Sequence, residues 1–170
     1  GEGIYGFPAM GFKNALLSVA HKDKGIAKTN VMAALWINAQ IARAQPAFEG
    51  AVCDMPLLRI YGSEPVNRED MVKIGSGLNK TASLAYRAQF TVWAFRVSGK
   101  FNADAITIEQ LAFLISEAGM ACGLGEWRNE RKGMFGAFHA ADLEEEAAWD
   151  AFAAGSGALP QPSYLAEAAQ

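Results

Sequence analysis

The chain has 170 residues, and because 51% of them are apolar it can form one domain with a buried core. It contains no apolar run of the roughly 20 residues that a membrane span needs, and it opens without a basic and apolar signal peptide. We therefore expect a cytoplasmic protein without a membrane partner. Cys53 and Cys122 show neither a CxxC pair nor a zinc spacing, so we expect buried thiols, no metal and no cofactor.

The net charge of −3 conceals an uneven distribution. Residues 1–132 contain all 15 Lys and Arg residues and 12 acids, a balance of +3, whereas residues 133–170 contain 6 acids and no Lys or Arg. A basic body with an acidic tail is typical of nucleic-acid binders. The same charges also fit a solvated helix at 142–154 and a flexible tail at 155–170, a segment that could contact a protein partner.

Residues 8–21 are expected to form the first helix, because Pro8 suits a first helical turn and apolar residues follow at helical spacing. The residues directly before this helix resemble the end of a strand. An N-terminal piece, even a whole first strand, is therefore expected to be missing from this sequence. Cations gather on and just after the helix, at Lys13, Lys22, Lys24 and Lys28.

The next segments are expected to combine short strands with a long excursion. Residues 31–42 fit a helix or a strand, and the alternation of their apolar residues favours the strand. Residues 57–61 form a short β-type run. Residues 63–80 contain Pro65, Gly75 and mixed charge, which indicates a long loop or a small insertion.

Residues 84–101 are the clearest strand region, since they are rich in aromatic and β-branched side chains. Arg87 and Arg96 fall within this region. An arginine in so apolar a strand points to solvent, pairs with an acid or meets a ligand, and the first outcome is the commonest.

Residues 106–119 carry the signals of a well-defined helix. Thr107 and Gln110 form a capping box, and Gly119 is expected to end the helix. Residues 134–140 are expected to be the final strand. The helix stripe that packs on the sheet consists of Leu111, Leu114, Ile115 and Ala118.

Residues 123–138 are the most informative stretch for function, because they combine four glycines with cations and aromatic side chains. Glycines let backbone N–H groups approach a phosphate, cations neutralise it, and flat rings stack on bases. The alternative is a glycine-rich β-hairpin with solvated basic residues. The cations are Arg128, Arg131 and Lys132, and the aromatics are Trp127, Phe135 and Phe138.

The order of helix, strand pair, helix and strand, with a missing first strand, is that of a ferredoxin-like or RRM-like βαββαβ domain. Two motifs make a resemblance specific. Gly-Phe-Pro-Ala-Met-Gly-Phe-Lys-Asn-Ala-Leu at 6–16 resembles the opening of the first helix in the RAMP superfamily, the RNA-binding proteins of CRISPR systems. Residues 123–138 are similar to the glycine-rich loop near the C-terminus of that superfamily.

A family of largely uncharacterised phage and prophage proteins shows a closer resemblance, over residues 5–139. It shares the Gly-Glu-Trp-Arg and Gly-x-Phe-Gly-x-Phe elements of the glycine-rich stretch and a Tyr-Arg-x-x-Phe like that at 86–90. The resemblance implies one RAMP-like domain over residues 1–141, with an insertion at 63–80, that binds single-stranded RNA or DNA in many adjacent copies. RNA is favoured over DNA.

The candidate nucleic-acid-binding residues come from the first helix, the aromatic strand region and the glycine-rich stretch. They are Lys13, Lys22, Lys24, Lys28, Arg87, Arg96, Trp127, Arg128, Arg131, Lys132, Gly133 and Phe135.

Two other function classes stay open. In a metal-independent endoribonuclease, His21 would act as general base toward a ribose 2′-OH, and a second proton-transfer group such as His139 would have to lie within reach. In a phage structural or host-inhibitory protein, the fold would bind another protein. We favour a binder that has no catalytic residue.

Overall fold

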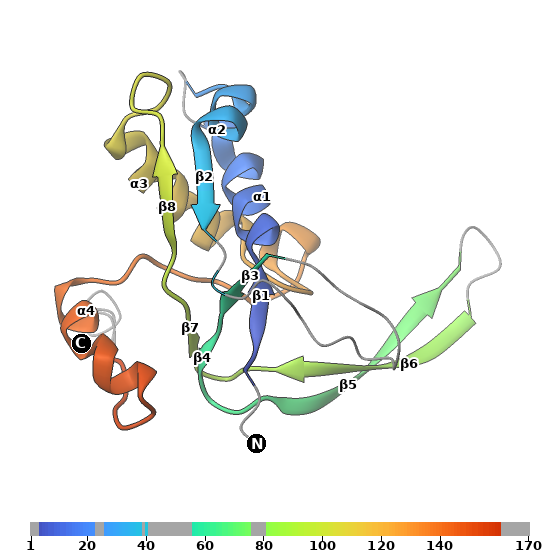
Figure 1. The fold of residues 1–170 in the computed structure, drawn as a ribbon. Helices are drawn as coiled ribbons and strands as arrows, with labels where there is room; N and C mark the ends of the chain where they lie inside the picture. The colour runs from blue at the N-terminus through green and yellow to red at the C-terminus, as the bar shows by residue number, and fades with distance from the viewer. Residues whose placement is uncertain (1–3, 23–25, 39, 41–55, 76–80, 161–170) are drawn as a thin grey trace, which may run out of the picture.

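The computed structural model describes residues 4–22, 26–38, 40, 56–75 and 81–160, which form an α+β fold (Figure 1). The α-helices of this part are α1 (Ala9–Val19), α2 (Lys28–Ala34), α3 (Ile108–Glu117) and α4 (Leu143–Ala153). Its strands pair as antiparallel ladders: β1 (Gly6–Pro8) with β3 (Leu57–Arg59), β2 (Leu35–Asn38) with β8 (Ser98–Phe101), β4 (Tyr61–Gly62) with β7 (Trp93–Ala94), and β5 (Val66–Ile74) with β6 (Thr81–Gln89). The predicted α+β class is confirmed, and the ladders in the described residues are two-stranded.

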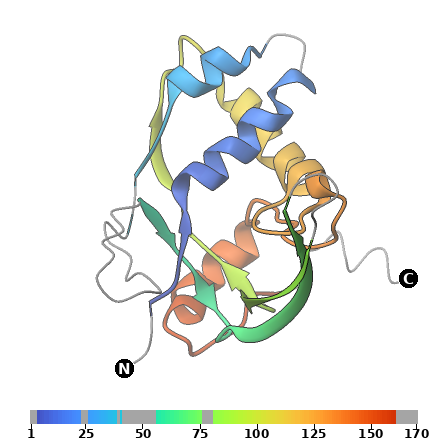
Figure 2. The same cartoon turned by 90° about the vertical axis from the view of Figure 1, so that its right-hand side faces the viewer.

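The first helix forms as predicted and lies at the centre of the core (Figure 2). Phe12, Leu16 and Val19 are buried along one face of α1, which contacts α3 and the π-helical turn η2 (Ala118–Cys122). The strand β1 directly precedes α1, in agreement with the strand end expected there. Helix packing against α3 therefore places η2, and the glycine-rich stretch that follows it, beside the first helix.

The helix predicted at 106–119 is confirmed as α3, including its capping box. The Thr107 hydroxyl accepts from the Gln110 backbone N–H at 3.3 Å, and the Thr107 N–H donates to Gln110 Oε1 at 3.0 Å. The predicted stop at Gly119 is wrong, because the chain continues through η2 to Gly123, whose φ is +73°. Gly119 instead allows close packing, since an added Cβ would lie 1.9 Å from the Phe138 carbonyl oxygen.

The single strand predicted at 31–42 is wrong in its first part, where the chain forms α2 before β2 begins. Val31 is fully buried by α2, whereas the predicted alternation holds in β2, where Leu35 is buried and Trp36 is exposed. Lys13 reaches across from α1 and donates to the carbonyl oxygens of Met32 at 2.8 Å and Leu35 at 2.6 Å. These bonds satisfy carbonyls at the end of α2, where the helix itself supplies no donors.

The long loop that was one alternative for 63–80 is also wrong, because residues Val66–Ile74 form β5, which pairs with β6 in a long hairpin that we call the β5–β6 hairpin. The register runs from Val66 opposite Gln89 to Ile74 opposite Thr81. The hairpin extends away from the helices (Figure 1). Its nine-residue strands give it a face that can line a site.

The strand region predicted at 84–101 is broken into β6, β7 and β8. Ser63 causes the break after Gln89, because its hydroxyl oxygen accepts from the N–H groups of Thr91 and Val92, both at 3.2 Å. This side chain satisfies donors that a continuous ladder would otherwise use. The turn sends β7 and β8 toward the helices, away from the hairpin (Figure 1).

The final strand predicted at 134–140 is wrong, because this segment joins no ladder among the described residues. Its one β-type contact there is an isolated parallel bridge between Arg128 and Phe135. Backbone hydrogen bonds tie the segment to Gly119 and Leu124 instead. The segment therefore closes the glycine-rich stretch onto η2 rather than adding an edge to a sheet.

The acidic helix predicted at 142–154 is confirmed as α4, with Asp142 as its N-cap. Acids in the first turn suit the positive end of a helix dipole. Two of them also bind the body of the chain: Glu145 is buried, and Glu146 pairs with Arg96. Part of the acidic segment is therefore engaged in contacts within its own chain.

Among the described residues, no helix has both the length and the apolar character that crossing a lipid bilayer requires. The flexible tail predicted at 155–170 lies outside the described residues from residue 161 onward.

Candidate nucleic-acid interface

A groove of about 740 Å³ lies between the β5–β6 hairpin and the glycine-rich stretch 123–138, which we call the glycine-rich loop. Four arginines line it, two from each side. We call it the arginine groove, and its charged lining residues are Arg68, Glu69, Asp70, Arg87, Glu126, Arg128 and Arg131. Because segments that are far apart in sequence form its two walls, the groove exists only in the folded chain.

Glycines give the glycine-rich loop its shape. Gly123 and Gly136 have φ values of +73° and +74°, which side-chain-bearing residues rarely adopt. An added Cβ on Gly136 would lie 1.8 Å from the Leu124 carbonyl oxygen, and one on Gly133 would lie 1.6 Å from the Trp127 carbonyl oxygen. The loop therefore folds tightly on itself, with Leu124 buried and with Trp127 and Met134 exposed.

Arg128 holds the loop together. Its guanidinium donates to the Gly125 carbonyl oxygen at 3.0 Å and to Glu130 Oε2 at 2.6 and 3.1 Å. Glu130 also accepts from the Cys122 thiol at 3.6 Å, and the bond from Arg128 holds the pKa of Glu130 below its usual range. Cys122 is buried as predicted, whereas Cys53 lies outside the described residues. Arg128 thus contributes to loop structure as well as to the charge of the groove.

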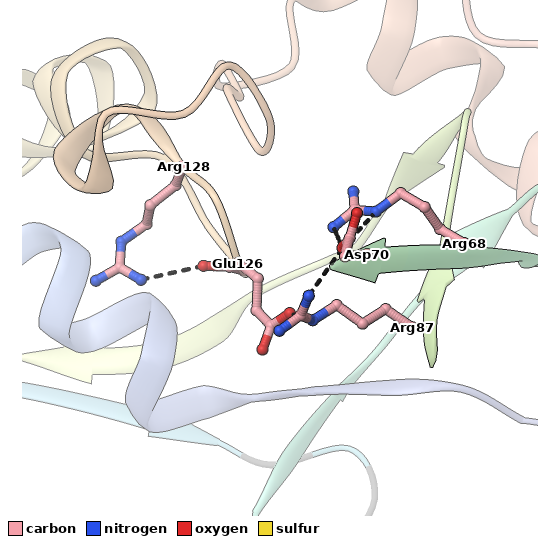
Figure 3. Close-up of polar contacts among 6 residues, drawn as sticks. Arg68, Asp70, Arg87, Glu126 and Arg128 are labelled. Carbon is pink, nitrogen blue, oxygen red and sulfur yellow. Dashed lines mark hydrogen bonds and ion pairs between the residues drawn. The ribbon is translucent and has the colours of Figure 1, made fainter. Parts of the chain in front are cut away.

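On the hairpin side, Asp70 bridges two arginines (Figure 3). Its Oδ2 accepts from Arg68 Nη2 at 2.7 Å and from Arg87 Nη1 at 2.8 Å. Hydrogen bonds from Arg68 and Arg87 hold the pKa of Asp70 below its usual range. Arg87 also pairs with Glu126 of the glycine-rich loop, so this arginine joins the two walls of the groove.

Aromatic side chains lie beside these charges. Trp127 is 58% exposed and contacts Phe135 edge-to-face, with ring centroids 5.6 Å apart. The Arg68 guanidinium lies over the Phe135 ring, 4.8 Å from its centroid. A guanidinium in this position is attracted by the ring face, and the exposed indole offers a free surface for stacking.

A second cavity, of about 780 Å³, adjoins the arginine groove, because Arg68, Arg87, Gly125 and Glu126 line both. We call it the aromatic cavity. Its rings are those of Phe7, Phe90, Trp93, Phe95 and Phe135. A ligand that follows the groove therefore passes from a charged surface to a surface of stacked rings.

The structure brings some of the predicted binding residues together and separates others. Arg87, Trp127, Arg128 and Arg131 line the arginine groove, Phe135 lines the aromatic cavity, and Lys132 and Gly133 belong to the same loop.

Lys13, Lys28 and Arg96 do not line the groove. Lys13 is engaged in supporting α2, and Lys28 is exposed in the first turn of that helix. Arg96 pairs with Glu146 and lies over the ring of Trp149, 4.8 Å from its centroid. The side chains of the remaining two, Lys22 and Lys24, lie outside the described residues.

The two histidines lie on different elements. His21 is exposed in the 3-10 turn η1 (Ala20–Lys22), and His139 precedes α4. His139 Nε2 lies 2.9 Å from Oε1 of the buried Glu145, so its ring is engaged by α4. Within the described part of the chain, no group of three His, Cys, Asp or Glu residues could hold a metal ion.

Sequence reasoning missed Arg68 and Asp70, which stand on β5. The available signal was Gly75-Ser76-Gly77, a turn-prone sequence between two runs of mixed apolar and polar residues. Polar side chains that face a groove weaken the apolar alternation by which a strand is recognised. The missed residues therefore lie on the face of β5 that lines the arginine groove.

Comparisons with known proteins gave no match. No protein-family model, no curated protein and no solved structure matches the chain.

Proposed function

We propose that this chain is a non-catalytic, cytoplasmic binder of single-stranded nucleic acid, with RNA favoured over DNA. The observation that carries the proposal is the joining of four arginines and an exposed tryptophan in one groove, continuous with a cavity lined by aromatic rings. Guanidinium groups suit phosphates, and exposed rings suit unstacked bases. Single strands present both groups at once, whereas a duplex hides the faces of its bases.

The charges of the groove suggest a binder of moderate, salt-dependent affinity. Its arginines are partly balanced by Asp70 and Glu126, so phosphates must compete with these carboxylates. Arg131 differs because it is exposed on the loop wall. Arg131 is therefore the best-placed residue for a first phosphate contact.

The resemblance of residues 6–16 and 123–138 to the RAMP superfamily, and of residues 5–139 to the phage family, supports the same function. The order β1, α1, β2, β8 and α3 fits most of a ferredoxin-like βαββαβ arrangement. We include that arrangement in the proposal. The β5–β6 hairpin would be an insertion in it.

The proposal extends to self-association along the bound strand. Met71, Leu84 and Tyr86 are exposed on one face of the hairpin, and Met71 stands opposite Leu84. The other face of the same hairpin supplies Arg68, Asp70 and Arg87 to the arginine groove, and Met71 also reaches its lining. Contact between copies through the outer face would place successive grooves in line, which is how a small domain covers a long strand.

The proposal is tested by fluorescence anisotropy with labelled single-stranded RNA, single-stranded DNA and duplex of the same sequence. We expect both single strands to bind more tightly than the duplex, and RNA to bind at least as tightly as DNA. Arg131→Glu should weaken binding strongly, whereas Lys100→Glu, an equal charge change at an exposed position on β8, should have a much smaller effect. Failure of every nucleic acid to bind, or equal loss in the two variants, would contradict the proposal.

A further inference from the structure

Arg68 and Arg87 stand directly opposite each other on β5 and β6. Both side chains are largely shielded, with 21% and 28% of their surface exposed, and both line the arginine groove. Like charges directly opposite each other on a strand pair are destabilising. An anion is therefore needed between them.

Asp70 supplies this anion from the same face of the hairpin. One oxygen, Oδ2, accepts three hydrogen bonds: from Arg68 Nε at 2.9 Å, Arg68 Nη2 at 2.7 Å and Arg87 Nη1 at 2.8 Å. Forked guanidinium donors of this kind match a carboxylate and a phosphate equally well. The two arginines thus form a preorganised oxyanion site, which in this structure is filled by a side chain of the protein.

We propose that Arg68 and Arg87 form a phosphodiester-binding site, and that Asp70 occupies it as a phosphate mimic until a nucleic-acid strand displaces the carboxylate. The inference rests on the proposed function and specifies its anion site.

The surroundings of the pair support this assignment. The site opens into the arginine groove, where Trp127 is exposed on the facing loop. Arg87 is held from that loop by Glu126 as well. The lowered pKa of Asp70 keeps its carboxylate ionised, so it carries the negative charge that the mimic requires. A phosphodiester has two non-bridging oxygens, which can accept hydrogen bonds from the same guanidinium groups of Arg68 and Arg87.

The test compares wild-type protein with Asp70→Asn and Glu69→Gln in anisotropy titrations with a labelled single-stranded oligonucleotide. Glu69 precedes Asp70 on β5 and also lines the groove, but it makes no bond to Arg68 or Arg87, so Glu69→Gln removes the same charge from the groove without freeing the arginine pair. We expect Asp70→Asn to bind roughly fivefold or more tightly than wild type, because displacement of charge-assisted bonds no longer opposes binding. Glu69→Gln should change affinity much less.

A second variant tests the arginine pair without relying on the folding of Asp70→Asn. Arg68→Ala should weaken binding and reduce the log–log salt slope by about 0.7, the value for one phosphate contact on a single strand. An unchanged slope in Arg68→Ala, or equal affinities of wild type, Asp70→Asn and Glu69→Gln, would overturn the inference while leaving the proposed function intact. If none of the proteins binds, the proposed function fails and the inference fails with it.

Discussion

The carbonyl oxygen of Trp127 lies only 1.6 Å from the position that a Cβ on Gly133 would take. The two backbone segments therefore pack closely, and the glycine-rich loop closes at this point. The Gly133 N–H also donates to the Arg128 carbonyl oxygen at 3.0 Å. The exposed position of the Trp127 ring thus depends on the absence of a side chain at Gly133.

We predict that Gly133→Ala opens the loop. The clash with backbone atoms should cost about 2 kcal/mol or more of unfolding free energy, measured by urea denaturation, and should weaken nucleic-acid binding. Gly125→Ala is the matched control, because a Cβ there meets no atom within 4 Å and only the φ of +79° is unfavourable, at about 1 kcal/mol. Equal losses of stability in the two variants would contradict this description of the loop.

A substitution at Trp127 tests its role in nucleic-acid binding separately from its role in stability. Its φ of +52° is strained for a residue with a side chain, so Trp127→Gly relieves about 1 kcal/mol of backbone strain while removing a mostly exposed ring. The variant also loses the edge-to-face contact with Phe135, which offsets this relief, so we predict a thermal midpoint close to that of wild type. Because stacking on one base contributes about 1 kcal/mol or more, nucleic-acid affinity should fall by roughly fivefold or more. Unchanged affinity in a folded Trp127→Gly protein would remove Trp127 from the interface.

The Asp70 cluster predicts a specific dependence of stability on pH. The pKa of Asp70 is lower in the folded protein than its usual value of about 4, so the ionised carboxylate stabilises the fold above that pH. This contribution is lost as the pH falls through the lowered folded pKa. Thermal melting should show wild type more stable than Asp70→Asn near neutral pH, with the difference shrinking in acid. A difference that stays constant through the acid range would contradict the ion cluster.

Self-association should depend on the outer face of the hairpin. We predict that wild-type protein forms assemblies on a long single strand, seen by light scattering, and that the double variant Leu84→Ser with Tyr86→Ser, which changes two exposed residues outside the groove, binds as separate monomers. Ala82→Ser changes another exposed position of β6 and should assemble like wild type. One wild-type protein per long strand at saturation would end the idea of adjacent copies.

The sequence predicted those parts of the fold whose signals are local. The Thr107 and Gln110 capping box specifies where α3 begins, and Asp142 does the same for α4, because each cap acts within one turn. The break after β6 depends instead on Ser63, which lies 28 residues before its partner Thr91. No periodicity near Thr91 could reveal that interaction.

Of the two walls of the candidate site, only one could be predicted from local signals in the sequence. The loop wall was predictable, because glycines, cations and aromatic residues are adjacent in the sequence at 123–138. The hairpin wall was not predictable, because Arg68 and Asp70 form a site only when β5 pairs with β6, which places Arg87 opposite Arg68. Arg87 itself was a candidate, and its two acidic partners account for its place in an apolar strand.

The salt dependence of binding tests the central claim, that the arginine groove binds the phosphates of a single strand, most directly. For wild type, roughly four phosphate contacts predict a log–log slope near −3 in anisotropy titrations. The double variant Arg131→Ala with Lys132→Ala, which changes two exposed loop cations, should flatten the slope by about 1.4, whereas Lys100→Ala should leave it unchanged. A wild-type affinity that does not vary with salt, or a slope that both variants leave the same, would contradict the account.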